Sequence, residues 1–212
     1  LLDQLFGALP EAPAPAAPPL PAFALRGNSV VEVDAPQSTV IFGQPGPAVT
    51  DPDWEAAGVA MRVLAGGGFS SRLMNAVRVE RGLSYGIGAG FDVVAGQGLA
   101  IGSVATENAR VAETLTVLRA EWARMAAEGP TEEEMADAIA YLSGSLPLQF
   151  TDSRRTASIL LGLRRNNRPL DWLSGRPARL ASLGRERVAA VARRLLDVDA
   201  LGAAVAGKPV GL

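Results

Sequence analysis

Residues 64–91, LAGGGFSSRLMNAVRVERGLSYGIGAGF, decide the fold of this chain. The three glycines at 66–68 predict a turn, because glycine readily adopts backbone conformations that other residues avoid. Ser70 or Ser71 can cap a short helix after that turn, and Gly82 ends it. From residue 83 to 93, large apolar residues alternate with small or polar ones, which predicts a strand. The glycines of that strand fall on one face and leave it bare for another backbone to approach.

Two side chains stand out at the junction of this helix and this strand. Arg78 falls in the last turn of the helix, and Tyr85 falls just inside the strand. The chain reversal at Gly82 and Leu83 can bring them together at the edge of the sheet. A guanidinium and a phenol so placed are donors suited to carbonyl oxygens or to a developing oxyanion.

The flanking sequence predicts the rest of the fold. Residues 28–34 and 38–43 predict two short strands, and Thr50-Asp51-Pro52 predicts the start of a helix. Further elements are a strand at 98–106, a long helix at 108–128 with an apolar stripe, a helix capped by Thr131 and Glu134, helices at 152–165, 172–183 and 185–196, and a strand at 200–206. Strand pairs joined by short turns predict an α+β fold, a largely antiparallel β-sheet with helices packed on one face.

The start of the chain predicts a domain boundary. Residues 10–21, PEAPAPAAPPLP, contain six prolines and favour an extended, semi-rigid linker. We expect residues 1–22 to be the end of a preceding domain plus this linker. Residues 23–212 are then expected to form a single domain.

The composition excludes several functional classes. The 212 residues include neither His nor Cys, so imidazole ligands, histidine bases, thiolate catalysis and disulfides are ruled out. Twenty basic residues against 22 acidic ones give a net charge of -2, which argues against a general nucleic-acid binder. No apolar run reaches the roughly 18 residues needed to span a membrane.

Three segments resemble one family of enzymes. Within the opening stretch, SSRL and VRVERGLSY match the pattern Ser-Arg-Leu and then Leu-Arg-x-x-x-Gly-Leu-x-Tyr. The segment before it, VIFGQPGPAVTDPDWEAAGVAMRVLAGGG, and the C-terminal SLGRERVAAVARRLLDVDALGAAVAGKP fit the same family in the same order. The chain thus resembles the pitrilysin/insulinase zinc metallopeptidases, which include the mitochondrial processing peptidase, over about residues 28–208.

The resemblance implies a role without catalysis in this chain. The catalytic half of such enzymes carries a His-x-x-Glu-His zinc motif, which a chain without His cannot provide. The chain therefore resembles the C-terminal domain of the non-catalytic half, with zinc expected in a partner subunit or half. By this resemblance Arg78 and Tyr85 hold the peptide substrate and support the oxyanion, and the loop Gly66, Gly67 and Gly68 can touch substrate. Two-chain bacterial members often work in the periplasm, which is the location we expect.

Other interpretations remain open at this point. Tyr85 shares its predicted face with Leu83 and Ile87, so it can be a core tyrosine, and Arg78 can be a cation favoured by the helix dipole. Arg72 is expected to tie its helix to acidic or carbonyl groups rather than to bind substrate. The glycine loop lacks the lysine of a phosphate-binding loop. The alternative function is a structural scaffold of the same fold, as in the respiratory-chain core subunits.

Overall fold

A computed structural model describes residues 1–10, 27–94 and 97–212 of the chain. Its sheet has five strands in the spatial order β1 (Asn28–Glu32), β5 (Gly202–Gly207), β2 (Gln37–Pro45), β4 (Gln97–Glu107) and β3 (Ile87–Val94). The β1–β5 pair is parallel, and the other three pairs are antiparallel. The predicted α+β fold with a largely antiparallel sheet is confirmed.

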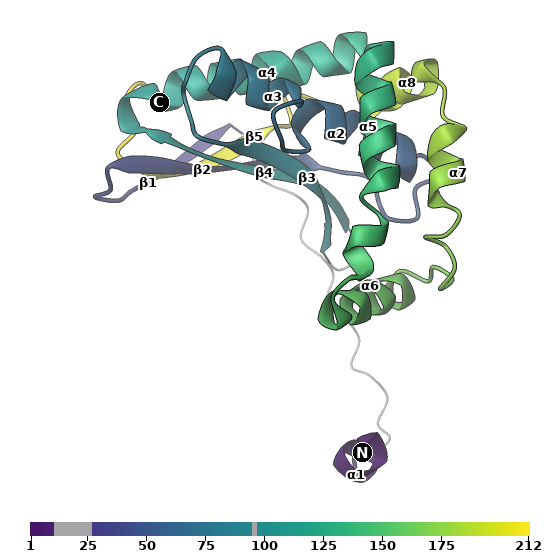
Figure 1. Cartoon of the computed structure of the whole chain (residues 1–212). Helices are drawn as coiled ribbons and strands as arrows, with labels where there is room; N and C mark the ends of the chain where they lie inside the picture. The colour runs from purple at the N-terminus through teal and green to yellow at the C-terminus, as the bar shows by residue number, and fades with distance from the viewer. Residues whose placement is uncertain (11–26, 95–96) are drawn as a thin grey trace.

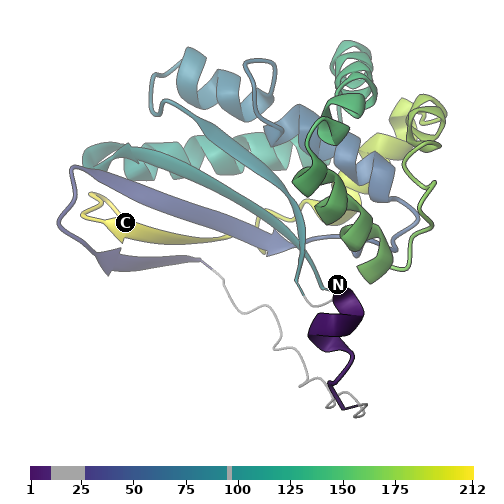
Figure 2. The same ribbon diagram turned by 60° about the horizontal axis from the view of Figure 1, so that its bottom comes forward.

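Several of the helices lie over one face of this sheet. The helices in the described residues are α1 (Leu2–Phe6), α2 (Trp54–Ala65), α3 (Arg72–Met74), α4 (Val111–Glu128), α5 (Glu132–Gly144), α6 (Ser153–Arg165), α7 (Arg176–Ala181) and α8 (Arg185–Leu195). Short 3₁₀ turns lie at Asn108–Arg110 and Pro147–Phe150, and a π-helical turn at Asn75–Val79. Figures 1 and 2 show α2, α4 and α8 over the same face of the sheet. No helix in the described ranges has the length and apolarity to cross a membrane.

The core lies between the sheet and the helices α2, α4 and α8. The predicted apolar stripe of α4 is buried along its whole length, namely Val111, Leu115, Leu118, Trp122 and Met125. The Trp122 ring meets Phe42 of β2 edge to face, with 6.1 Å between ring centroids. Its buried Nε1–H donates to Oε1 of Gln44 at 2.7 Å, so the one polar atom of the indole is satisfied.

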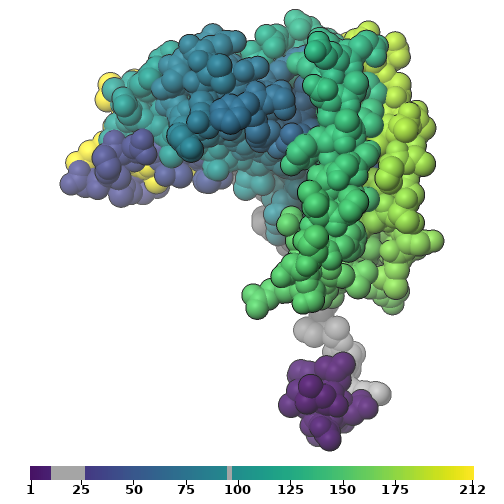
Figure 3. Space-filling view, viewed as in Figure 1, coloured from purple at the N-terminus to yellow at the C-terminus, as the bar shows by residue number. Residues whose placement is uncertain are grey.

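No described helix covers the opposite face of the sheet. Ile41 of β2 and Ile101 of β4 point to this side and are each 42% exposed. Figure 3 shows that α5 and α6 project past the sheet at one end, so the wall they form stands beside the open face.

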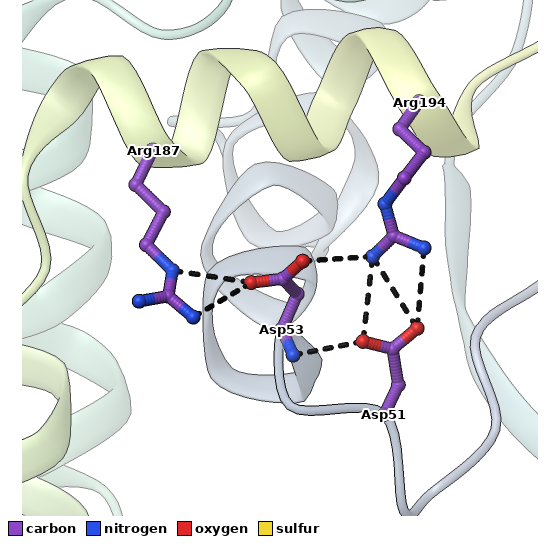
Figure 4. Close-up of polar contacts among 4 residues, drawn as sticks. All are labelled: Asp51, Asp53, Arg187 and Arg194. Atoms are coloured by element: carbon purple, nitrogen blue, oxygen red, sulfur yellow. Dashed lines mark hydrogen bonds and ion pairs between the residues drawn. The ribbon is translucent and has the colours of Figure 1, made fainter.

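Ion pairs attach α8 to the start of α2. The Asp53 carboxylate accepts from Arg187 at 2.8 Å and from Arg194 at 3.0 Å, and Arg194 also contacts Asp51 (Figure 4). The predicted helix start at residues 50–52 is wrong by a few residues. The Asp51 side chain accepts from the backbone N–H of Asp53 and closes a turn, so the helix begins only at Trp54.

Two further boundaries differ from the sequence prediction. The strand expected from residue 83 begins at Ile87, because residues 83–86 form a loop tied to β4 through Thr106 and Ser84. The helix expected at 172–183 shortens to α7, preceded by turns at residues 170–175. The predicted linker falls mainly on residues 11–26, outside the described residues, as does part of the turn between β3 and β4.

Candidate functional site

The glycine loop follows directly from the end of α2. Gly67 and Gly68 have φ angles of 75° and 73°, the left-handed region that glycine alone adopts without strain. The Arg62 side chain reaches over the loop, and its Nη1 donates to the carbonyl oxygens of Gly66 and Gly67. The loop is therefore held in shape by an arginine one turn back in α2.

A short helix, α3, and the π-helical turn follow the loop. Ser71 occupies the N-cap position, but its hydroxyl donates to the carbonyl of Gly68 and does not cap the helix. Arg78 lies within the π-helical turn, a conformation that is rare and often found at functional sites.

Arg72, at the start of α3, is a structural residue. It is 7% exposed, and Nε and Nη2 each donate to Glu134 at 2.7 Å while Nη2 also donates to the Gly129 carbonyl. The hydrogen bond with Glu134 raises the pKa of Arg72, against the opposing effect of burial. Thr131 and Glu134 form the predicted capping box of α5, so this ion pair fixes α3 to the beginning of α5.

The chain reverses sharply after the π-helical turn. Gly82 has a φ of 57°, and its N–H donates to the carbonyl of Arg78 while the N–H of Leu83 donates to Val77. Arg110 of the next 3₁₀ turn donates to the carbonyls of Arg81 and Gly82. These bonds close the helix end and direct the following loop back along it.

This reversal brings Arg78 and Tyr85 together. The Arg78 guanidinium carbon lies 4.1 Å from the centre of the Tyr85 ring and 4.6 Å from the centre of the Phe69 ring. Both distances are within the range of cation–π attraction. Phe69 directly follows the glycine loop, so the loop, the π-helical turn and the reversal all contribute to one cluster, which we call the Arg78 cluster: Phe69, Arg78 and Tyr85.

The Arg78 cluster faces solvent. Tyr85 is 85% exposed and Phe69 is 64% exposed. Within the described part of the chain, the Arg78 guanidinium forms no hydrogen bond or ion pair; its contacts are the two rings. A guanidinium with free N–H donors thus stands beside a phenol hydroxyl, which suits recognition of carbonyl or carboxylate oxygens.

The structure decides between the interpretations of Tyr85. The core interpretation is wrong, because the ring lies in a loop before β3 and projects outward instead of sharing a buried strand face. The expectation that Arg78 and Tyr85 meet is confirmed by their contact. The sequence pattern did not point to Phe69, although a phenylalanine between a glycine loop and a polar helix start is an unusual place for an apolar ring.

The chain does not supply a metal site in the described residues. They contain no group of three or more acidic side chains close enough to hold a metal ion, and the sequence offers no His or Cys. The side chains of the described residues therefore do not fit a zinc ion by themselves.

Comparison with protein families gives one match over most of the chain. The model of the family described as "Peptidase M16 inactive domain" matches residues 1–142. An uncharacterised zinc protease of Streptomyces coelicolor is 34% identical over 165 residues, covering 76% of this chain and 35% of that protein. A non-peptidase homologue, YmxG, of Helicobacter pylori is 29% identical over 150 residues, covering 70% of this chain and 34% of that protein.

A solved structure resembles the whole described fold. The crystal structure of a peptidase M16 inactive domain from Pseudomonas fluorescens superposes with a TM-score of 0.86 at 30% identity. The match covers 98% of this chain and 49% of that one. The chain therefore spans about a third of the length of these two curated relatives and half of the solved protein.

Proposed function

Because the chain belongs to the peptidase M16 inactive-domain family, we propose that it is the substrate-binding part of a two-part zinc metalloendopeptidase. A partner subunit or half with a His-x-x-Glu-His motif would hold the zinc, which polarises the peptide carbonyl and activates water. This chain would contribute the Arg78 cluster, whose donors complete the site from the opposite side.

One observation carries the proposal. Among the described residues the Arg78 guanidinium has no hydrogen-bond or ion-pair partner, and it is held against two aromatic rings on an exposed surface. A cation without a carboxylate partner at such a place is poised for an oxygen of another molecule. Arg78 would bind backbone carbonyls of an extended peptide, and the Tyr85 hydroxyl would donate to the carbonyl oxygen at the bond to be cleaved as negative charge develops there.

The glycine loop would support this arrangement. Its shape depends on Arg62 and on the φ angles of Gly67 and Gly68, and it positions Phe69 against Arg78. The loop would also lie close enough to a peptide at the Arg78 cluster to contact it through the backbone.

The test is to produce the chain together with a homologous partner that carries the zinc motif and to measure cleavage of a fluorogenic peptide. Tyr85→Phe removes only the hydroxyl and is expected to lower kcat by about 10²–10³-fold, the usual effect of losing one oxyanion donor. Arg78→Ala is expected to lower kcat/KM strongly, mainly through substrate binding. The control is Arg154→Ala on α6, an exposed arginine outside the site, which is expected to leave cleavage unchanged.

The alternative is a scaffold that takes no part in cleavage. The name of the Helicobacter pylori relative, a non-peptidase homologue, is the reason to keep it. Full activity of the Arg78→Ala and Tyr85→Phe variants in an active complex would favour the scaffold and reject the substrate-binding role. We also propose a periplasmic location, which fractionation of cells producing the full-length protein would test.

A further inference from the structure

A cavity of about 260 Å³ opens where α2, β3, α5 and α7 meet. Its walls include Trp54 and Met61 of α2, Phe91 of β3, Tyr141 of α5 and Arg176 of α7. Trp54 and Phe91 lie in tilted contact, with 6.2 Å between ring centroids. Pockets for drug-sized ligands begin at about 300 Å³, so this cavity suits a single amino-acid side chain better than a whole cofactor.

The charges around the cavity select against a basic occupant. Among the described residues that line it, Arg62 and Arg176 are charged and none is acidic. The Arg62 guanidinium carbon lies 3.6 Å from the centre of the Tyr141 ring. The Nη1 of Arg62 donates a hydrogen bond to the glycine loop. Arg176 shares the single carboxylate of Glu55 with Arg179, which leaves this side of the cavity positive. An apolar or aromatic side chain complements these walls, whereas Lys or Arg would be repelled.

One glycine leaves room inside the cavity. A Cβ atom built on Gly58 of α2 would meet no other atom within 4 Å. Glycine in the middle of a helix is less stable than alanine. A helical glycine that faces open space therefore lowers the stability of its helix and avoids no steric clash. Its effect is to leave free volume in the cavity.

The neighbouring strand offers the means to hold a peptide. β3 is the edge strand of the sheet, and the described backbone hydrogen bonds of Ile87–Val94 to other strands all go to β4. Its outer row of N–H and C=O groups can pair with an added strand, a recurring mode of peptide recognition. Residues opposite each other in paired strands share a face, so a side chain opposite Ala89 or Phe91 would point to the helix side, where the cavity lies.

We propose that this cavity is a side-chain subsite that receives a bulky apolar or aromatic residue of an extended peptide paired with β3. This inference rests on the proposed function in one respect, which is that the peptide paired with β3 is taken to be the substrate of the peptidase. Tyr85 precedes the strand wall of the cavity by four to six residues, which is about 13–20 Å of extended chain. The cavity therefore selects a residue several positions away from the bond held at the Arg78 cluster.

The test measures peptide binding to the full 212-residue chain by fluorescence anisotropy. The probes are fluorescein-labelled nonapeptides of Thr and Gln that differ at the central residue, which is Phe, Ala or Lys. The Phe peptide is expected to bind at least about tenfold more tightly than the Ala peptide, because its ring is buried. The Lys peptide is expected to bind no better than the Ala peptide. An N-methylated Phe peptide, which cannot donate to β3, is expected to lose binding.

Filling the cavity provides the matched variant. Gly58→Leu places a side chain in the open space and is expected to abolish the preference for Phe over Ala while the protein remains folded. Gly162→Leu in α6 is the control, because this helical glycine also faces open space but does not line the cavity. It is expected to keep the preference.

Several results would overturn the proposal: equal binding of the Phe and Ala peptides, no binding of any peptide, or an unchanged preference in folded Gly58→Leu. The assay needs neither zinc nor partner, so its outcome is separate from that of the cleavage test. Loss of the Phe preference with cleavage still dependent on Arg78 would reject the subsite alone. A retained preference with cleavage independent of Arg78 would reject the proposed function alone.

Discussion

Arg78 owes its position to backbone geometry within a few residues of it. The hydrogen bond from Gly82 to its carbonyl returns the chain toward it and delivers Tyr85, and the left-handed Gly67 and Gly68 aim Phe69 at its other side. The meeting of Arg78 and Tyr85 could be predicted, because a glycine between a helix and a strand implies a reversal. The contact with Phe69 could not, because the direction of the loop depends on φ angles that the sequence leaves open.

Exposure of Tyr85 leads to a prediction about stability. Tyr85→Ala is expected to change the free energy of unfolding by less than about 0.5 kcal/mol, since surface substitutions away from structural contacts rarely do more. Trp122→Ala, in the core, is expected to cost about 3–5 kcal/mol. Urea unfolding followed by circular dichroism measures both. A loss above about 2 kcal/mol for Tyr85→Ala, roughly the value of a buried side chain, would show that the ring is packed in solution.

The ion pair between Arg72 and Glu134 leads to a prediction about pH. Burial favours a higher pKa for Glu134, but hydrogen bonds from Arg72 and Thr131 outweigh it and hold the pKa below the ordinary value of 4.5. A carboxyl whose pKa is lower in the folded state stabilises the fold above its unfolded pKa. That contribution is lost as the pH falls from about 4.5 toward the folded value.

Glu134→Gln is therefore expected to destabilise the protein at pH 7 by about 1.5–3 kcal/mol, the value of a hydrogen bond to a charged group. The difference from the unchanged protein should shrink as the pH falls below 4.5, because Glu134 is then increasingly protonated, first in the unfolded and then in the folded state. Thermal unfolding at several pH values measures this. A difference that stays constant down to about pH 3, roughly 1.5 units below the ordinary value of 4.5, would contradict it.

At the scale of elements, the order and type of the helices and strands could be predicted, but several ends could not. The apolar stripe of α4 and the capping box of α5 are local signals, and both were correct. The start of α2 was misplaced because the Asp51 side chain closes a turn on the N–H of Asp53. Both carboxylates also bind arginines of α8, more than 130 residues further along the chain, and local patterns contain no information about such partners.

The attachment of α8 to α2 is expected to depend on salt. Arg194→Ala removes contacts to both aspartates and should lower the free energy of unfolding by about 0.5–1 kcal/mol in dilute buffer, a typical value for partly exposed ion pairs. In about 1 M NaCl, where screening acts within roughly 3 Å, most of this difference should vanish. Urea unfolding at both salt concentrations gives the comparison. A loss that is independent of salt would mean that Arg194 acts through packing of its aliphatic part.

For the whole molecule, the sequence is informative about what the chain lacks and less informative about its cavity. The absence of His excludes an imidazole zinc site from composition alone. The cavity brings together residues within 54–66, 89–91, 141–142 and 176. In the sequence, each of them taken alone is typical of an ordinary core or surface position. Only the tertiary arrangement makes them a site.

The sheet depends on its last strand, β5, which pairs with β1 on one side and β2 on the other. A chain that ends at Asp199 is therefore expected to lose the cooperative unfolding transition, because β1 has no other partner in the described sheet and β2 loses one edge. Urea unfolding and limited proteolysis test this. A truncated chain that still unfolds cooperatively would show that β2, β3 and β4 with their helices suffice.

The same pairing sets the order of events during synthesis. Asn28 pairs with Ala203, so β1 leaves the ribosome long before the strand that will hold it. Val30 and Val31 cannot take their place in the sheet before β5 has been synthesised, and the position between β1 and β2 stays empty until then. The sheet of this domain is therefore completed only after β5 emerges, and until then its exposed strands are available to chaperones that bind unfinished proteins.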